Sequence, residues 1–61
     1  MRARVEVAYG EIYAGLSLDK WYQILGEKDG CFLIKDDFGN GIYIFQYGCM
    51  YLDGGDWEVE Y

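Results

Sequence analysis

Residues 31–45 constrain the fold more than any other part of this 61-residue chain. Two runs rich in β-forming residues, Cys31–Lys35 and Gly41–Phe45, flank the turn-forming segment Asp36–Asn40. This pattern is typical of a β-hairpin, with Gly39 in the left-handed conformation after a type I turn. A hairpin in the middle of so short a chain predicts a small, curled antiparallel sheet.

Alternation of apolar and polar residues continues on both sides of the hairpin, and this period of two is the signal of half-buried strands. It predicts further strands at Val5–Val7, Trp21–Leu25, Cys49–Leu52 and Trp57–Tyr61, and turns at Gly26–Gly30, Phe45–Gly48 and Asp53–Asp56. No segment has the apolar spacing of an amphipathic helix, and nine glycines interrupt the chain. The sequence therefore predicts an all-β fold.

Aromatic residues are more numerous than a core of this size can hold. A chain of about 60 residues buries only ~60% of its unfolded surface, and this one has two Trp, seven Tyr and three Phe. The strand phases predict a core of Phe32, Ile34, Ile42, Ile44, Leu16, Leu18, Ile24 and Val7. Eight other aromatics are then expected at the periphery: Tyr9, Tyr13, Tyr43, Phe45, Tyr47, Tyr51, Trp21 and Trp57. They form either an interaction surface or a second small cluster beneath residues 53–61.

The net charge of −6 is concentrated in the C-terminal half, where residues 36–61 include six carboxylates and no Lys or Arg. This sign is the reverse of what binding to a phosphate backbone requires, so direct nucleic-acid binding is not expected. The acidic half is either a solubilising surface or a face for a basic protein partner. No apolar run reaches ~18 residues and no apolar leader follows Met1, so we expect a soluble, cytoplasmic protein without a membrane segment.

Catalytic and metal-binding chemistry is poorly supplied. The chain has no His and a single Ser, Ser17, which excludes Ser–His and Cys–His pairs within one chain. Cys31 and Cys49 are expected to be reduced thiols, with a disulfide as the less favoured alternative. Asp36 and Asp37 are suited to capping the hairpin turn. We therefore expect no enzyme activity, no metal and no cofactor.

The order of the predicted elements resembles that of the SH3-like barrel family. The resemblance depends on the alternating segment Leu16–Lys20, which is similar to the family's diverging turn, on Tyr22–Leu25, on the pair Asp29–Gly30, and on the glycine-led strand Gly41–Ile44. It covers residues 5–52 and implies a single domain, 1–61. That domain would be a small barrel of five to six short antiparallel strands, with residues 53–61 as an extra C-terminal strand.

The aromatic groove with which the family binds polyproline is not retained. Cys31 stands where the resemblance places a ligand-stacking Trp, and Phe45 stands where it places a Pro. The chain has no Pro at all, and Tyr47 is offset from the position of the family's Tyr. Small size and acidity are similar to those of stand-alone SH3-like proteins of bacteriophages and mobile elements, many of which bind and inhibit or redirect one host protein.

These observations favour a non-catalytic protein-binding module, an inhibitor or modulator of a host protein. The expected binding face combines aromatic and acidic side chains, namely Tyr9, Tyr13, Phe45, Tyr47, Asp36 and Asp37. Two alternatives remain open. The chain could be an acidic mimic of nucleic acid that occupies a basic groove, or a homo-oligomer that associates through its edge strands and surface aromatics.

Overall fold

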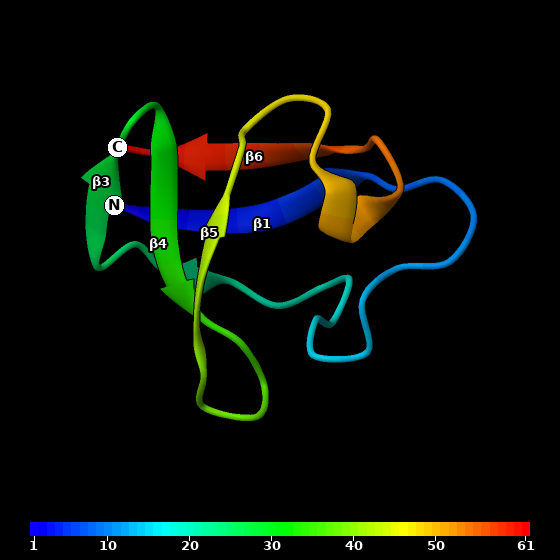
Figure 1. The fold of residues 1–61 in the computed structure, drawn as a ribbon, viewed down its shortest axis with the longest axis horizontal. Coiled ribbons are helices and arrows are strands. Elements are labelled where there is room, and N and C mark those ends of the chain that lie inside the picture. The colour runs from blue at the N-terminus through cyan, green and yellow to red at the C-terminus, as the bar shows by residue number, and fades with distance from the viewer.

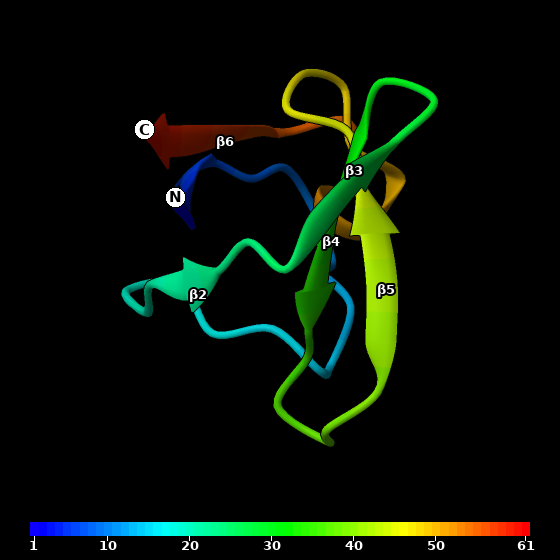
Figure 2. The same cartoon turned by 90° about the vertical axis from the view of Figure 1, so that its left-hand side faces the viewer.

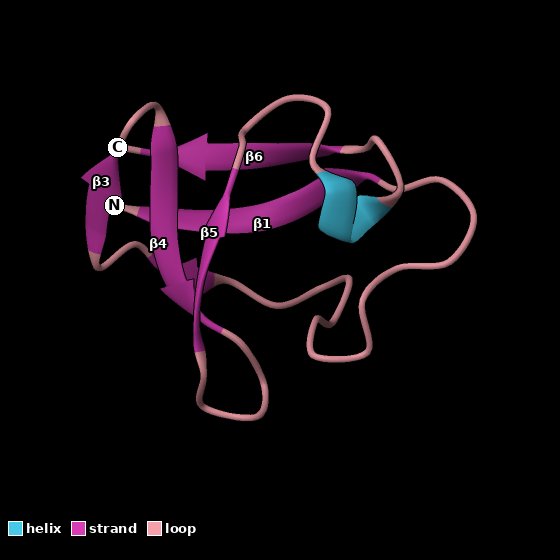
Figure 3. Ribbon diagram, in the orientation of Figure 1, coloured by secondary structure: helices cyan, strands magenta, loops and turns pink.

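The computed structural model describes all 61 residues and contains two small antiparallel sheets. The first has the strand order β2-β1-β6 and the second the order β3-β4-β5 (Figures 1 and 3). The elements along the chain are β1 (Arg2–Val7), β2 (Tyr22–Gln23), β3 (Gly26–Lys28), β4 (Cys31–Lys35), β5 (Gly41–Ile44), the 3₁₀ helix η1 (Met50–Leu52) and β6 (Asp56–Glu60). There is no α-helix, and every strand pair is antiparallel, so the all-β prediction is confirmed.

The first and last strands of the chain pair with each other. β6 runs antiparallel to β1 from Arg2↔Glu60 to Val7↔Asp56, with a bulge between Val5 and Val7. Figure 1 shows the two strands side by side behind β4 and β5. The strand predicted at residues 57–61 is confirmed, and its backbone completes the sheet that contains the N-terminus.

The prediction of a single strand at 21–25 followed by a turn at Gly26–Gly30 is wrong. β2 belongs to the first sheet, and Gly26–Lys28 is the strand β3 of the second sheet. Only Asp29 and Gly30 turn the chain, with φ of 52° and 80°. Two positive φ values make a two-residue hairpin turn whose twist matches that of the flanking strands, so pairing extends up to Lys28↔Cys31.

The β4–β5 hairpin has the predicted form. Phe32 pairs with Ile44 and Ile34 with Ile42, while Gly39 has a φ of 85°. β5 ends at Ile44, so Phe45 lies beyond the strand. The local turn residues and the alternation of apolar side chains together account for this agreement.

The strand predicted at Cys49–Leu52 is wrong, whereas the chain does bend within the predicted turn Phe45–Gly48. Residues 46–48 form bends, and the 3₁₀ helix lies at Met50–Leu52, with Leu52 N–H donating to Cys49 C=O (3.0 Å). A 3₁₀ helix has three residues per turn, so Cys49 and Leu52 point the same way. Both are buried while Met50 is exposed, a spacing of three that a strand, with its period of two, would not give.

The core lies between the two sheets and consists of Ala3, Leu16, Tyr22, Phe32, Ile34, Ile44, Cys49, Leu52 and Trp57. Four predicted members are thus confirmed, and Ile24 and Ile42 are partly buried against them. Leu18, predicted inside, is exposed, and Val7 is only half-buried. Trp57, expected at the periphery, is fully buried and packs edge-on against Tyr22 at 6.0 Å. The only helix has three residues, and no helix here is long and apolar enough to span a bilayer.

Candidate binding surface

Asp36 holds the hairpin turn and the long loop together. Its Oδ2 accepts a hydrogen bond from the Tyr13 hydroxyl (2.6 Å), and its Oδ1 accepts from the backbone N–H groups of Phe38 (3.0 Å) and Asn40 (2.8 Å). The Tyr13 bond is the main cause of a lowered Asp36 pKa, and Asp36 in turn raises the Tyr13 pKa. Asp36 is buried, so the structure gives this predicted site residue internal partners.

Asp37 is bound in the same way. It accepts hydrogen bonds from Lys20 Nζ (2.7 Å), the Ser17 hydroxyl (2.7 Å) and the Tyr22 hydroxyl (2.9 Å). The charged Lys20 bond is the largest contribution and, with the two hydroxyls, lowers the pKa of Asp37 to about 2. The Asp37 N–H also donates to Gly15 C=O (2.7 Å). We call this packed contact between residues 13–22 and 36–40 the loop–hairpin junction.

Tyr13, the third predicted site residue, is part of this junction. Its ring packs against Tyr51 at 5.2 Å and meets the edge of Phe38 at 6.4 Å. Its backbone N–H donates to Tyr51 C=O (2.8 Å), which fixes the loop against η1. A Cβ on Gly15 would lie 2.5 Å from the Tyr13 ring, so the ring needs the glycine beneath it.

Tyr9, Phe45 and Tyr47, the other predicted aromatics, are exposed. Tyr43 and Met50, which the sequence interpretation did not assign to the face, are exposed as well. Tyr43 is 47% exposed, Phe45 52%, Tyr47 70% and Met50 80%. A signal for this grouping was present, since residues 41–52 contain no charged residue. We call these four side chains the apolar strip.

Pairing between β4 and β5 places one member of the strip, Tyr43, on the sheet face that points away from the core. Leu33 pairs with Tyr43, and both lie opposite the inward-facing Ile34 and Ile44. The ladder ends at the pair Phe32↔Ile44, and Phe45 follows directly after β5. The strip therefore begins on the outer face of the second sheet and continues into the loop that leads to η1.

The outer face of the first sheet is different, because its charges are paired. Arg2 binds Glu60 at 2.9 Å and Arg4 binds Glu58 at 3.0 Å. Both guanidinium groups also lie over the Trp21 ring, at 4.1 and 4.5 Å from its centroid. Such contacts add cation–π attraction to exposed ion pairs. This face has little unpaired charge to offer a partner.

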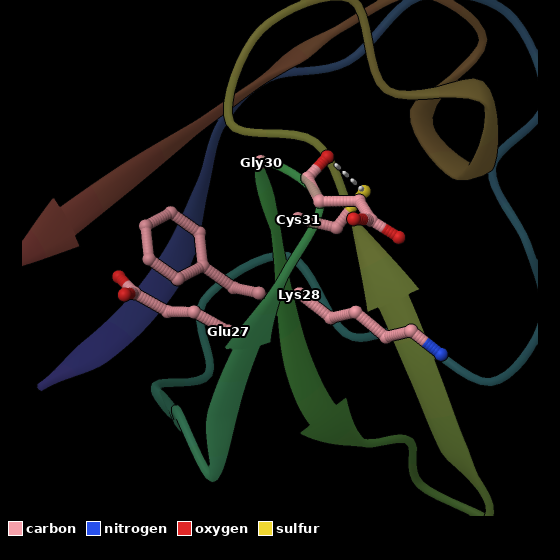
Figure 4. Close-up of a pocket in the computed structure, with 6 residues that line it drawn as sticks. Glu27, Lys28, Gly30 and Cys31 are labelled. Atoms are coloured by element: carbon pink, nitrogen blue, oxygen red, sulfur yellow. Dashed lines mark hydrogen bonds between the residues drawn. The ribbon is translucent and has the colours of Figure 1, made fainter.

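A shallow hollow lies at the β3–β4 turn and is lined by Glu27, Lys28, Asp29, Gly30, Cys31 and Phe32. Figure 4 shows that these side chains diverge: Glu27 lies on one side of the hairpin, and Lys28 and Cys31 lie on the other. A small-molecule site needs a few polar groups that converge, and this hollow has none. Both cysteines are free, and no three metal-ligating side chains come together.

No protein-family model matches the chain, and neither a curated protein nor a solved structure is significantly similar to it. The assignment of a function therefore depends on the surfaces described above. The loop–hairpin junction is saturated with internal hydrogen bonds, whereas the apolar strip is open. The apolar strip is the better candidate for a binding surface.

Proposed function

We propose that this chain is a non-catalytic protein-binding module built on an SH3-like barrel. The order of the elements supports the barrel: a long loop follows β1, β2 and β3 continue one another across the two sheets, and η1 precedes β6. A hydrogen bond from the backbone N–H of Trp57 to the backbone C=O of Gln46 (2.7 Å) joins the chain beyond β5 to β6. That bond connects the loop after β5, and not the edge of β5 itself, with β6, and it supports a barrel-like arrangement of the two sheets.

The exposed apolar strip is the observation that carries the binding function. Tyr, Phe and Met are enriched at the centres of protein–protein interfaces, where charged residues are depleted. The strip has this composition within a chain that is otherwise acidic. A partner that covers Phe45, Tyr47 and Met50 would remove three exposed apolar side chains from water.

The partner is a folded protein surface and not a polyproline segment. Cys31 pairs with Lys28 next to the β3–β4 turn, and Phe45 follows β5; neither residue offers the rigid stacking groove that a proline helix uses. Binding one host protein and so inhibiting or redirecting it is the activity that a domain of this size can perform without catalytic groups.

Mimicry of nucleic acid has less support than a strip-centred interface. Of the six carboxylates in residues 36–61, Asp36 and Asp37 are held in the junction and Glu58 and Glu60 are paired with arginines. Asp56 accepts a hydrogen bond from Gly48 N–H (3.0 Å). A mimic needs free negative charges in a row, and most of these charges are already engaged.

Affinity capture tests the proposal directly. Three immobilised chains are exposed to a lysate of the source cell: the wild type, a Phe45→Ser/Tyr47→Ser double variant, and a Tyr61→Ser control, whose target is 80% exposed beyond β6. We expect a specific protein on the wild type and on the control but not on the double variant. Near-UV circular dichroism checks that all three are folded. The same set of captured proteins on all three chains would exclude the strip as the binding surface.

Salt distinguishes the two binding modes in the same experiment. An interface centred on aromatic contacts keeps its partner when the salt concentration rises from about 0.1 M to 1 M, over which the screening length falls from ~10 to ~3 Å. Elution of the partner over this range, irrespective of the strip variants, would favour the nucleic-acid mimic instead.

A further inference from the structure

β5 has an open edge. The strand pairs with β4 alone and lies at the outer margin of its sheet (Figure 2). The backbone bond from Asp36 N–H to Asn40 C=O (2.8 Å) marks a hydrogen-bonded pair of the hairpin, and such pairs recur at every second residue. Ile42 and Ile44 therefore direct their backbone groups toward β4. Gly41, Tyr43 and Phe45 direct theirs away from the sheet.

The other sheet edges carry the features that discourage strand pairing. β2 has two residues, β3 includes Glu27 and Lys28, and β6 includes Asp56, Glu58 and Glu60. Short length and charged side chains are the usual protection of an edge. β5 has neither charge nor proline, and residues 41–52 continue this uncharged composition. The edge of β5 is therefore the one sheet edge without such protection.

We propose that β5 pairs antiparallel with β5 of a second copy of this chain, about a two-fold axis at Tyr43. In this register Tyr43 faces Tyr43 of the second copy, and Gly41 faces Phe45 of the second copy. The outward N–H and C=O groups of all three residues then find partners. The two three-stranded sheets become one six-stranded sheet, which is the self-complementary geometry of a two-fold dimer.

Side chains fit this register. Phe45 is placed opposite Gly41 of the second copy, where the missing side chain leaves room for an aromatic ring, an arrangement that stabilises glycines at sheet edges. On the other face of the sheet Ile42 and Ile44 stay packed in the core of their own chain. On the outer face, the row formed by Leu33 and Tyr43 is extended across the axis by Tyr43 and then Leu33 of the second copy. Apolar and aromatic pairs of this kind stabilise neighbouring strands.

Charge favours a second copy at this edge over any other edge. Each chain has a net charge of −6, so two copies repel each other wherever carboxylates meet. Residues 41–45 have no charged side chain, so approach along them brings no carboxylate of this segment into the contact. This inference goes beyond the proposed function, because it requires no host partner, although Tyr43 and Phe45 take part in both proposed contacts.

Sedimentation velocity of the purified chain tests the proposal. A standard protein–protein interface buries about 800 Å² of the surface of each partner. That area is a large part of the 3916 Å² surface of this protein. A contact along one strand edge is smaller, so we expect a weak dimer. Between about 10 μM and 1 mM, a range that suits a weak complex, the mean mass should rise from 7.1 kDa toward twice that value. A mass that stays at 7.1 kDa throughout overturns the proposal.

Three variants test the register. Tyr43→Lys puts two like charges on the axis and should remain monomeric, whereas the matched control Tyr61→Lys should associate like the wild type. A mixture of Tyr43→Lys and Tyr43→Glu should recover the dimer, because opposite charges then face each other. Association of Tyr43→Lys alone to the wild-type extent, or a mixture that stays monomeric, overturns the register.

Amide hydrogen exchange tests the same pairing on the wild type, so this test does not depend on the folding of any variant. Protection of the Tyr43 amide should increase with protein concentration by the same factor as the dimer population. The Ile42 and Ile44 amides are already bonded to β4 and should change little. A Tyr43 amide that exchanges at the same rate at all concentrations overturns the proposal, even if the mass increases.

Discussion

The loop–hairpin junction and the apolar strip use similar residues in opposite ways. In the junction, the hydroxyls of Tyr13 and Tyr22 donate to the adjacent carboxylates Asp36 and Asp37. In the strip, Tyr43 and Tyr47 are exposed and no carboxylate lies nearby in the sequence. A tyrosine with a buried acceptor holds the fold together, whereas a tyrosine without one is available to a partner. The difference teaches that the surroundings of an aromatic residue, and not its type, decide its role.

Matched glycine substitutions should separate the two regions most strongly. A Cβ at Gly15 would lie 2.5 Å from the Tyr13 ring and 3.0 Å from Asp36 Oδ2, whereas a Cβ at Gly41 would meet only Leu33 Cδ1 at 3.4 Å. Overpacking of this kind costs up to about 3 kcal/mol. We expect Gly15→Ala to lower the free energy of unfolding by about that amount, and Gly41→Ala to change it little. Urea denaturation of dilute protein measures both, and equal effects would contradict the comparison.

Removal of one hydroxyl from each region should give a smaller difference. Tyr22→Phe deletes the group that accepts from Ser17 N–H (2.7 Å) and donates to Asp37 (2.9 Å). Loss of a partnered group at a buried site costs about 1–2 kcal/mol, so we expect this decrease in the free energy of unfolding. Tyr43→Phe should leave the stability unchanged within error. A Tyr43→Phe variant as unstable as Tyr22→Phe would show that the strip is also structural.

Acid should weaken the junction and leave the strip unaffected. The Asp37 pKa is lowered from 3.8 to about 2 in the folded state, so the unfolded chain binds the proton first. The contribution of the ionised Asp37 carboxylate to stability is complete above about pH 4 and is lost as the pH falls toward 2. We expect the wild-type melting temperature to decrease over this interval. The difference between wild type and Asp37→Asn should shrink in parallel, and a constant difference would contradict the assignment.

Substitutions within the strip should have the smallest effect on stability. Phe45 and Tyr47 are exposed, and exposed positions without internal bonds usually change the free energy of unfolding by no more than ~0.5 kcal/mol. We expect Phe45→Ser/Tyr47→Ser to unfold at nearly the wild-type urea concentration at low protein concentration. A loss of more than 1.5 kcal/mol, or about one order of magnitude in the folding equilibrium, would assign the strip to the fold.

The sequence by itself determined the elements that depend on near neighbours. The β4–β5 hairpin, its turn at Gly39, the alternation that buries Ile34 and Ile44, and the last strand could all be predicted, because turn chemistry and a period of two act within a few residues. The uncharged segment 41–52 was also visible in the sequence, although we assigned only Phe45 and Tyr47 to the binding face.

Only the tertiary structure decided the features that depend on distant contacts. Trp57 is buried because β6 pairs with β1, and Cys49–Leu52 turns as a 3₁₀ helix because a spacing of three residues reaches the core. Asp36 and Asp37 have internal partners because the loop brings Tyr13, Lys20 and Tyr22 to them. A carboxylate binds whichever donor the fold places next to it, and donors 15–23 residues away are not visible in the local sequence.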